Sequence, residues 1–510
     1  MKQQQVVILG GGSAGWMTAA MLSKTLGPAL DLTLVESEAI GTVGVGEASI
    51  PPLALFNQAL GIDEQAFMAA TQGSFKLGIR FEGWGQPGER YLHAFGPIGK
   101  DLGLTPFYHY WLRSQSQSGQ PLDPTTLWRY SLNSQAAEAN KFARLDRVPG
   151  TPLGGLVHAY HFDASLYAQY LRRYSEQRGV RRVEGKVERV HLHPVSGDIQ
   201  ALQLADGRRI EGQLFIDCSG LGARLIDGAL NTGFDDWSHW LPCDRAWAVP
   251  TQNTGPLRPY TRAIAHEAGW QWQIPLQHRS GNGLVFASRY LEEDAAKALL
   301  LENLEGTPLA EPRLIRFRVG RRRQQWQRNC IAIGLSSGFL EPLESTSIHL
   351  IQSAIMRLVK LFPAQGGDAQ ALRDEFNRQS QVEFEQIRDF IILHYHLNRR
   401  GDAPLWQHCR TMALPDSLAH KLALFQQSGR LVRQQEELFT ETAWQQVMLG
   451  QGWLPESHSP LAQNLSEAQL EEFLANYRTL VDHAVTQLPT HGDYLAQYCP
   501  ASKSNTEVPA

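Results

Sequence analysis

The sequence predicts an α/β fold that begins with a doubly wound, Rossmann-like unit. Residues 6–9 (VVIL) form a continuous, partly β-branched apolar run that stops at glycines, as expected of a strand buried on both faces of a parallel sheet. A helix is expected over residues 13–26, and residues 32–35 form a second strand that ends at Glu36. Doubly wound nucleotide-binding folds start with such a β-α-β unit.

Further strands and helices follow this unit. The aromatic-rich stretch 107–130 and the amphipathic run 163–178 are expected to be helical, and residues 187–204 to form alternating strands around a turn. Residues 214–217 and 330–333 are apolar strands that lead into glycines. Strand ends of this kind line the nucleotide crevice in doubly wound sheets.

The chain divides into a main module and a helical lobe. We assign residues 1–370 to the main module, with inserted, substrate-facing elements at about 74–180 and 235–320. Residues 371–500 are rich in Gln, Glu, Leu and Ala with few β-branched runs, which indicates a helical C-terminal lobe that completes the substrate pocket. Residues 501–510 are small and polar and are expected to form a flexible tail.

Composition excludes several classes of protein. A net charge of -4, from 47 basic and 51 acidic residues, provides no field that would gather nucleic acid or an anionic membrane. The five cysteines are odd in number and contain no CxxC pair, which argues for reduced thiols and against a metal site. No signal peptide and no apolar run of about 20 residues is found. We therefore expect a cytoplasmic protein that is not integral to a membrane.

A glycine-rich loop follows the first strand and opens the first helix. It satisfies GxGxxG, in which small residues let the backbone approach a pyrophosphate and let the helix N-terminus face its charge. Glu36 stands where it could bind a ribose hydroxyl. The alternative is a purely structural turn. The predicted phosphate-binding residues are Gly10, Gly12, Ser13, Ala14 and Gly15.

The nature of the dinucleotide is open at this point. Gly41, Gly44 and Gly46 offer a second backbone surface along which a longer cofactor such as FAD could lie. Composition alone does not decide between FAD and NAD, so an NAD-dependent dehydrogenase is the alternative.

Four further segments together resemble the flavin-dependent halogenases, the family of tryptophan halogenases and their relatives. They are residues 44–49 (GVGEAS), 75–78 (FKLG), 270–275 (WQWQIP) and 341–346 (EPLEST). The WxWxIP element is the most specific and distinguishes this family from ordinary flavin monooxygenases. The resemblance extends from Val6 to about Leu461 and implies an FAD-binding module of the flavin monooxygenase type.

The resemblance also implies a chemistry. Reduced FAD and oxygen form a flavin hydroperoxide, a halide ion opens it to hypohalous acid, and an internal tunnel leads that acid to a lysine, which is Lys76 in this chain. A lysine suits this task because its ammonium can donate to the hypohalous oxygen, while its amine could form a haloamine if desolvation lowers the pKa. Outside the family context, Lys76 would be expected on the surface.

The resemblance also implies a catalytic carboxylate and a halide-binding loop. Glu344 occupies the position of a carboxylate that stabilises the cationic ring intermediate and helps to remove its proton. Its alternative role is to cap a helix that begins near Ser345. Thr346 and Ser347 match the halide-binding loop. Tryptophan-specific members have glycine in place of Ser347, so the sequence leaves chloride and bromide both open.

The remaining assignments concern flavin contacts and a partition between flavin and substrate. The predicted flavin contacts are Glu47, Val187, Leu335 and Ile348. The partition would prevent direct oxygen transfer to the substrate, although the same residues could form an ordinary aromatic core. Its predicted residues are Trp270, Trp272, Ile274 and Pro275.

The substrate pocket is assigned by resemblance to His93, Phe95 and His394. Their rings could stack on an indole, although a lone histidine is more often a hydrogen-bonded structural residue. Tryptophan-specific members recognise the amino-acid end of their substrate through a tyrosine pair that residues 438–446 lack. A larger or less polar indole, or a carrier- or peptide-bound aromatic, is therefore as plausible as free tryptophan.

Two alternatives to a halogenase are open. Since only one dinucleotide fingerprint is found, a halogenase would receive reduced FAD from a separate NAD(P)H-dependent flavin reductase. Separately, a homodimer is a possible oligomeric state. A flavin-dependent monooxygenase would hydroxylate its aromatic substrate and would not need Lys76. A flavoprotein sensor or scaffold would bind FAD without turnover.

Overall fold

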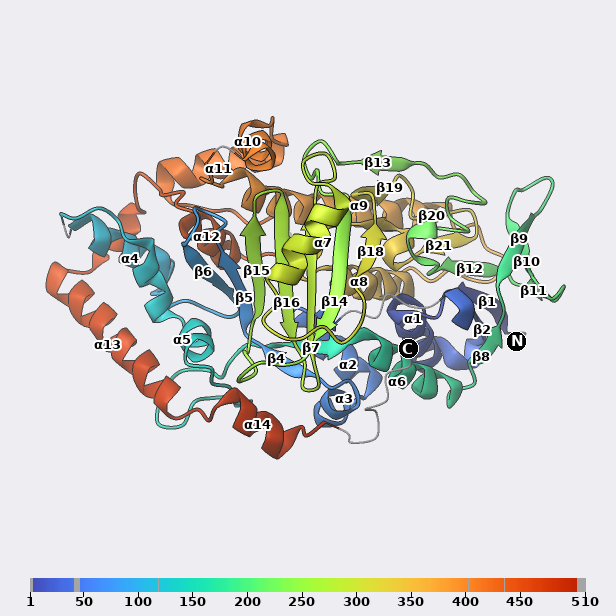
Figure 1. Ribbon diagram of the computed structural model, residues 1–510, viewed down its shortest axis with the longest axis horizontal. Helices are drawn as coiled ribbons and strands as arrows, with labels where there is room; N and C mark the ends of the chain where they lie inside the picture. The colour runs from blue at the N-terminus through green and yellow to red at the C-terminus, as the bar shows by residue number, and fades with distance from the viewer. Residues whose placement is uncertain (1–2, 41–45, 118, 402, 435, 502–510) are drawn as a thin grey trace.

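The computed structural model describes residues 3–501 apart from 41–45, 118, 402 and 435. Figure 1 shows an elongated molecule with a parallel sheet near the N-terminus at the right, a long antiparallel sheet in the centre and helices at the left. Part of the predicted second glycine surface, Gly41 and Gly44, lies outside the described residues.

The first sheet is the predicted doubly wound unit. Neighbouring strands are parallel except at the β20 edge, and the central strand β1 is covered on both faces, since Val6, Val7 and Ile8 are all buried. The strand order is β20 (Trp326–Gln327), β21 (Cys330–Ala332), β12 (Leu214–Asp217), β1 (Gln4–Leu9), β2 (Leu30–Glu36) and β8 (Arg181–Glu184). The helix α1 (Ser13–Leu26) joins β1 to β2, as the sequence predicts.

The second sheet forms the centre of the molecule. Its strands are antiparallel except where β15 runs parallel to β5. The strand order is β18 (Arg313–Arg316), β14 (Arg245–Thr251), β17 (Ser280–Phe286), β16 (Gly269–Pro275), β15 (Thr261–His266), β5 (Gly78–Glu82) and β6 (Arg90–Ala94). Side chains alternate between the faces of a strand, so β16 presents its tryptophans to one side and its glutamines to the other.

Three small sheets contain the remaining strands of the described residues. One carries Phe75 and Lys76 of the FKLG segment and runs β3 (Gly46–Ala48), β7 (Ala159–Asp163), β4 (Ser74–Lys76). The second is the predicted hairpin region, β9 (Val187–Leu192), β10 (Ile199–Leu204), β11 (Arg209–Glu211). The third is β13 (Phe234–Asp236), β19 (Gly320–Arg322), β22 (Gly338–Phe339).

Helices cover the sheets and are the main elements of the C-terminal region. Those before residue 370 are α2 (Pro52–Leu60), α3 (Glu64–Ala70), α4 (Phe107–Gln117), α5 (Leu132–Glu138), α6 (Ala164–Glu176), α7 (Glu293–Glu302) and α8 (Ser347–Lys360). Those after it are α9 (Gln370–His396), α10 (Pro404–Thr411), α11 (Asp416–Ser428), α12 (Glu441–Gly450), α13 (Glu467–Thr486) and α14 (His491–Tyr498). The predicted aromatic helix is interrupted, because α4 ends at Gln117 and a 3-10 segment, Pro124–Tyr130, follows.

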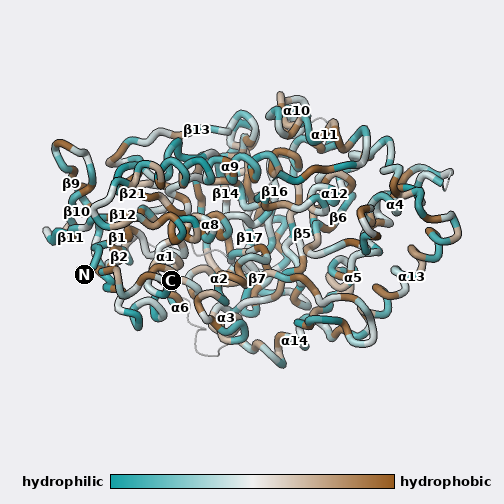
Figure 2. Tube along the Cα trace, turned by 180° about the vertical axis from the view of Figure 1, so that it is seen from behind, coloured by the Kyte–Doolittle hydropathy of each residue, from teal (hydrophilic) through white to brown (hydrophobic). Residues whose placement is uncertain are grey.

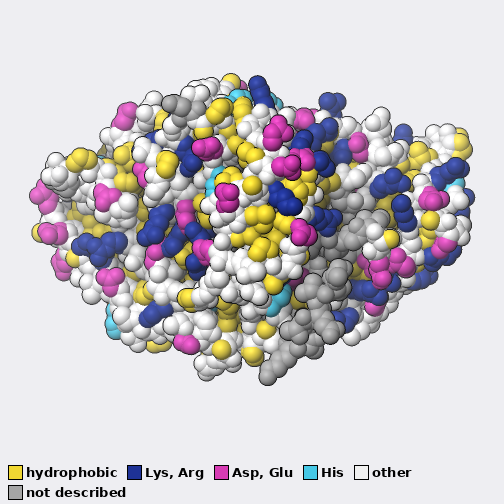
Figure 3. Space-filling view, in the orientation of Figure 1, with side chains coloured by type: hydrophobic (Ala, Val, Ile, Leu, Met, Phe, Trp, Pro, Cys, Tyr) yellow, Lys and Arg dark blue, Asp and Glu magenta, His cyan; other side chains and the backbone are white. Residues whose placement is uncertain are grey.

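The outer helices are amphipathic. Along α13, hydrophobic and hydrophilic residues alternate (Figure 2), and the buried ones, among them Leu470 and Leu474, recur at helical spacing. Figure 3 shows acidic and basic side chains interspersed over the visible face. Among the described residues, no helix combines the length and apolar character needed to span a bilayer. The predicted α/β fold class is confirmed.

Candidate active site

The glycine-rich loop has the geometry of a dinucleotide cradle. Gly10 has φ of 121°, and a Cβ there would come within 2.1 Å of the Cys218 carbonyl oxygen. A Cβ on Gly15 would come within 1.8 Å of the Gly10 carbonyl oxygen. A Cβ on Gly12 would meet nothing within 4 Å. At Gly10 and Gly15 a side chain would therefore collide with neighbouring backbone atoms. The backbone at Gly12 instead faces open space that a phosphate could occupy.

The N-terminus of α1 supplies donors to this space. Its N-cap, Gly12, provides no side chain to accept from the first-turn N–H groups, which include those of the half-buried Ser13 and Ala14. Glu36, at the end of β2, lies against the loop and accepts a hydrogen bond from Trp16 Nε1 (3.4 Å) while Arg182 pairs with its other oxygen. The open cradle and the carboxylate beside it fit a dinucleotide.

Two predicted flavin contacts lie on segments that pack against this loop or against α1. Gly334, which precedes the partly exposed Leu335, is so close to the loop that a Cβ there would stand 2.8 Å from the Ala14 Cβ. Ile348 is buried on α8, which packs against α1.

The other two predicted flavin contacts lie on different strands. Val187 is buried at the start of β9 and belongs to the second hydrophobic cluster. Glu47 lies on β3, and burial raises its pKa to about 7.

Lys76 is fully buried at the end of β4. Its Nζ donates to the Ser49 carbonyl oxygen (3.0 Å) and to Ser345 Oγ (2.7 Å), and it lies 5.5 Å from the centre of the Phe95 ring. Burial removes the hydration of the ammonium and lowers the pKa from 10.5 to about 7, although the negative charge of Glu344 acts in the opposite direction. Near neutral pH the side chain can therefore exist as ammonium or as amine.

The strand that carries Lys76 is fixed on both edges. Phe75 N donates to His491 Nε2 (3.1 Å), and Leu77 N donates to the Pro259 carbonyl oxygen (2.7 Å). Ser74 Oγ donates to the Pro275 carbonyl oxygen (2.5 Å) and contacts His161 Nδ1 (3.0 Å). Segments from very different parts of the chain thus hold the lysine in place.

Glu344 lies between two histidines. Its carboxylate is 1% exposed, and His93 Nδ1 lies 3.0 Å from Oε1 and 2.9 Å from Oε2. His394 Nε2 lies 2.7 Å from Oε1. Burial alone would raise the pKa of this carboxyl, but the two histidines outweigh it and lower the pKa to about 2. Glu344 is therefore a stable anion inside the protein.

A candidate anion site follows Glu344 directly. Ser345 has φ of 58°, Thr346 is the N-cap of α8, and Ser347 begins the helix. No side chain caps the first turn of α8, and Thr346 Oγ1 is buried without a hydrogen-bond partner among the described residues. Free N–H groups at a helix start and an orphaned hydroxyl are the donors that a halide ion requires.

The WxWxIP strand builds a wall beside these residues. Trp270, Trp272 and Ile274 share one face of β16 and are buried. Trp270 Nε1 donates to Glu341 Oε2 (3.0 Å), which also accepts from Tyr395 OH (2.5 Å). Burial raises the pKa of Glu341 to about 7.

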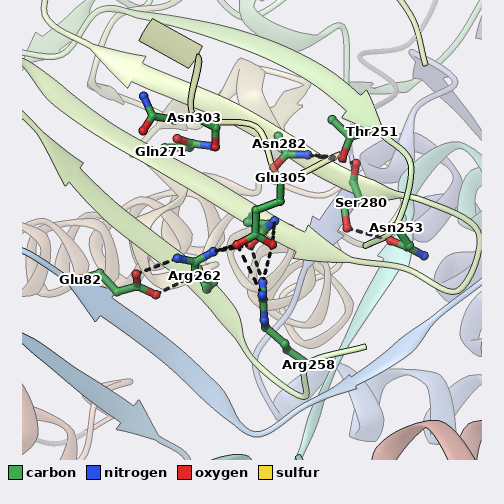
Figure 4. A network of polar contacts seen from close by, with 11 residues as sticks. Glu82, Thr251, Asn253, Arg258, Arg262, Gln271, Ser280, Asn282, Asn303 and Glu305 are labelled. Atoms are coloured by element: carbon green, nitrogen blue, oxygen red, sulfur yellow. Dashed lines mark hydrogen bonds and ion pairs between the residues drawn. The ribbon is translucent and has the colours of Figure 1, made fainter. Parts of the chain in front are cut away.

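The opposite face of this wall is polar, as Figure 4 shows. There Glu305 accepts from Arg262 Nη1 (2.5 Å) and Arg258 Nη1 (2.9 Å), while Arg262 Nε donates to Glu82 (2.6 Å). Gln271 from β16 reaches the Asn303 carbonyl oxygen (3.3 Å) on the same side. The tryptophan strand is thus fixed from behind by charged and amide groups.

The structure brings most of the predicted catalytic and pocket residues together. Lys76 and Glu344 are linked through Ser345, and Phe95, His93 and His394 adjoin them. Sequence reasoning missed Glu341, although it stands inside the quoted EPLEST segment. It also missed His491, for which the sequence carries no local signal. All five cysteines are free and buried, and no cluster of three or more His, Cys, Asp or Glu in the described part of the chain could hold a metal.

Comparisons with known proteins define the class. The family model for tryptophan halogenase matches residues 5–467. Tryptophan 7-halogenase RebH of Lentzea aerocolonigenes is 33% identical over 97% of this chain and 99% of its own length. The solved structure of Xcc4156, a flavin-dependent halogenase from Xanthomonas campestris, is 49% identical with a TM-score of 0.94, covering 98% of this chain and 99% of that one. BrvH, a flavin-dependent halogenase from Brevundimonas sp. BAL3, is 45% identical with a TM-score of 0.92, covering 98% and 100%.

The fold and these matches define a flavin-dependent enzyme. The chain belongs to the tryptophan halogenase family. The predicted family is thereby confirmed, whereas the comparisons leave the substrate open.

Proposed function

We propose that this enzyme halogenates an electron-rich aromatic ring, with an indole derivative as the favoured substrate class. The observation that carries the proposal is the placement of Lys76, which is fully buried and donates to Ser345. Ser345 directly follows the ionised Glu344 in the chain. When bound, reduced FAD together with dioxygen and chloride or bromide supplies hypohalous acid. The protein's own groups then determine where that acid goes.

The residues proposed to hold FAD surround the open cradle at α1. They are Gly10, Gly12, Ser13, Ala14, Gly15, Glu36, Glu47, Val187, Leu335 and Ile348. We assign the halide to Thr346 and Ser347, because the unfilled donors at the start of α8 suit a small anion.

Lys76 would hold the hypohalous acid and present its halogen to the ring. A buried amine with a pKa of about 7 can act as ammonium, donating to the hypohalous oxygen, or as amine, binding the halogen directly. Its enclosure excludes water, which favours delivery to the substrate over escape of the acid.

Glu344 would stabilise the positive charge that develops on the ring. An anion that is already in place requires no reorganisation as the charge forms, and low surrounding polarity strengthens its effect. Trp270, Trp272, Ile274 and Pro275 are proposed to separate the flavin from the substrate.

The substrate would lie among His93, Phe95 and His394. Phe390 and Phe439 stack at 3.8 Å beside His93 and extend this aromatic surface. The segment 438–446 lacks the tyrosine pair of tryptophan-specific relatives, so we propose an indole other than free tryptophan. A separate flavin reductase would supply reduced FAD.

The test is a reaction with a flavin reductase, NADH, FAD, and either bromide or chloride, using a panel of indoles and reading the products by mass spectrometry. We expect a product whose isotope pattern reports the halogen, and no such product when halide is omitted. A hydroxylated product formed without halide would instead support the monooxygenase alternative. Tight FAD binding with no product from any substrate would overturn the proposal.

A further inference from the structure

We propose that His109, Arg113, Arg430 and His458 form a binding site for an oxyanion, that is, for a carboxylate or phosphate group. The four side chains come from α4 and from the loops that follow α11 and α12, in the left part of Figure 1. The inference depends on positive charges and hydrogen-bond donors that meet in this region without an acidic partner.

Arg113 differs from every other buried arginine of the described residues. It is 4% exposed on α4 and forms no ion pair with a described carboxylate, although burying an unpaired guanidinium is unfavourable. The other buried arginines each pair with an aspartate or glutamate; they are Arg279, Arg321, Arg322, Arg357 and Arg388. A cation left in this state is suited to receive a negatively charged ligand.

The donors of Arg113 are only partly used by the protein. Nη1 donates to the carbonyl oxygens of Ala462 and Leu465, both at 2.7 Å. Nε is buried without a partner, and Nη2 has no hydrogen-bond partner among the described residues. Nε and Nη2 form one edge of the guanidinium, and such an edge binds two oxygens of a carboxylate or phosphate.

The other three basic side chains meet the same loop that Arg113 holds. His109 Nδ1 accepts a hydrogen bond from Ser459 N (3.2 Å), and Arg430 Nη2 lies 3.5 Å from Ser459 Oγ. His458 directly precedes Ser459 in the chain. Because its Nδ1 accepts from a backbone N–H, the neutral His109 ring carries its hydrogen on Nε2 and offers a further donor there.

These groups are surrounded by positive charge and not by acids. Burial, followed by the charges of Arg430 and His458, lowers the pKa of His109 to about 4. Burial and the charge of Arg113 lower the pKa of His458. Glu456, which stands on the same loop, is exposed and forms no ion pair among the described residues. A bound oxyanion would offset this repulsion and favour the protonated histidines.

The site borders the segment that forms part of the proposed substrate surface. Arg430 follows Gly429, the C-cap of α11, and lies on the connection to α12 that also carries Phe439. The Phe439 ring lies 6.4 Å from the His93 ring. The acid end of an extended aromatic substrate is therefore one source of the oxyanion, a reading that rests on the proposed function. A free inorganic anion is the other source.

The first experiment measures sulfate binding by isothermal titration calorimetry, because sulfate keeps its charge from about pH 6 to about pH 8. Saturating FAD and chloride are present throughout, so that the cradle at α1 and the start of α8 do not contribute. We expect saturable binding that tightens as pH falls, since the bound anion favours protonation of His458 and His109.

Arg430→Gln is the decisive variant, because Arg430 is exposed and its replacement should not disturb folding. It should weaken sulfate binding by about 10-fold, the typical effect of losing one charged hydrogen bond. Arg189→Gln is the matched control: it removes the same charge from an exposed position on β9 and should bind sulfate like the wild-type protein. His458→Gln should remove most of the pH dependence.

Arg113→Gln separates binding from a purely structural role. A variant with a lower melting temperature and wild-type sulfate affinity would show that Arg113 only holds the loop at Ala462 and Leu465, and would overturn its assignment. If this variant does not fold, Arg430→Gln and His458→Gln decide the question. Absence of saturable sulfate binding, or equal affinity in Arg430→Gln and the wild-type protein, would overturn the site itself.

A second experiment distinguishes the two sources of the oxyanion. KM is measured for indoles with carboxylate tails of increasing length and for the matched neutral amides. If the site holds the acid end of the substrate, Arg430→Gln should raise KM by about 10-fold for the long carboxylates and leave the amides unchanged. Unchanged KM values for all indoles, with weakened sulfate binding, would assign the site to a free anion. Absence of halogenated product would contradict the proposed function and leave the sulfate result intact.

Discussion

Replacing Lys76 with methionine should stabilise the protein while abolishing halogenation. The ammonium is fully buried, and the fall of its pKa from 10.5 to about 7 corresponds to about 5 kcal/mol of unfavourable free energy for the charged form. Methionine has a similar length and no charge. It loses two hydrogen bonds, to Ser49 and Ser345, each of which contributes about 1 kcal/mol. We therefore expect the variant to be more stable by about 3 kcal/mol at neutral pH.

The pH dependence of this gain has a definite sign. The folded lysine titrates near 7 and the unfolded lysine near 10.5, so between these values the unfolded chain binds more protons. The wild-type protein therefore gains stability as pH rises through this window. The advantage of the variant should be largest at and below pH 7 and should shrink as pH approaches 10.

The assay is urea unfolding of both proteins at about pH 7 and about pH 9.5, followed by far-ultraviolet circular dichroism. Lys100→Met is the matched control, because Lys100 is exposed and its replacement should change stability little. A Lys76→Met protein that is less stable than wild type at neutral pH, or a difference that does not depend on pH, would refute the account of this lysine.

Three further predictions concern charge, acid stability and the cradle. Glu344→Gln should lower the halogenation rate by about 10² to 10³-fold with FAD affinity unchanged, measured by turnover and flavin titration. Burial lowers the pKa of His491 from 6.5 to about 4, so the unfolded chain binds more protons than the folded protein between these pH values. The folded protein should therefore lose up to about 3 kcal/mol of stability from this group as pH falls from 6.5 to 4. Thermal melts of wild type and His491→Gln over this pH range check the expectation. Gly15→Val should abolish flavin binding, seen as loss of bound FAD absorbance, because its Cβ would stand 1.8 Å from the Gly10 carbonyl oxygen.

Local patterns were sufficient to predict the nucleotide-binding unit. The apolar run 6–9 and the glycines after it are consecutive in sequence, and their burial and turn geometry depend on near neighbours. The helix Ser13–Leu26 and the strand Leu214–Asp217 accordingly match their predicted bounds. The interruption of the aromatic helix after Gln117 was missed, since periodicity alone does not show where a 3-10 segment follows.

The contacts of the candidate site could not be predicted in the same way. Residue type alone places a lysine on the surface, and Lys76 is buried because β4 pairs with β7, more than eighty residues away. Glu344 meets His93 across 251 positions, so only the folded chain shows that its carboxylate is already engaged. His491 supports the lysine strand from beyond residue 467, where the family match ends.

In the proposed reaction, electrophilic halogen reaches the ring from the amine of Lys76. The most direct test compares halogenated indole formed per NADH consumed in the wild-type enzyme and in Lys76→Ala, with flavin reductase, FAD and bromide present and a scavenger for free hypobromous acid added. We expect the variant to bind FAD and consume NADH, to brominate the scavenger, and to yield no enzymatic product. Equal yields of brominated indole from both proteins would contradict the claim.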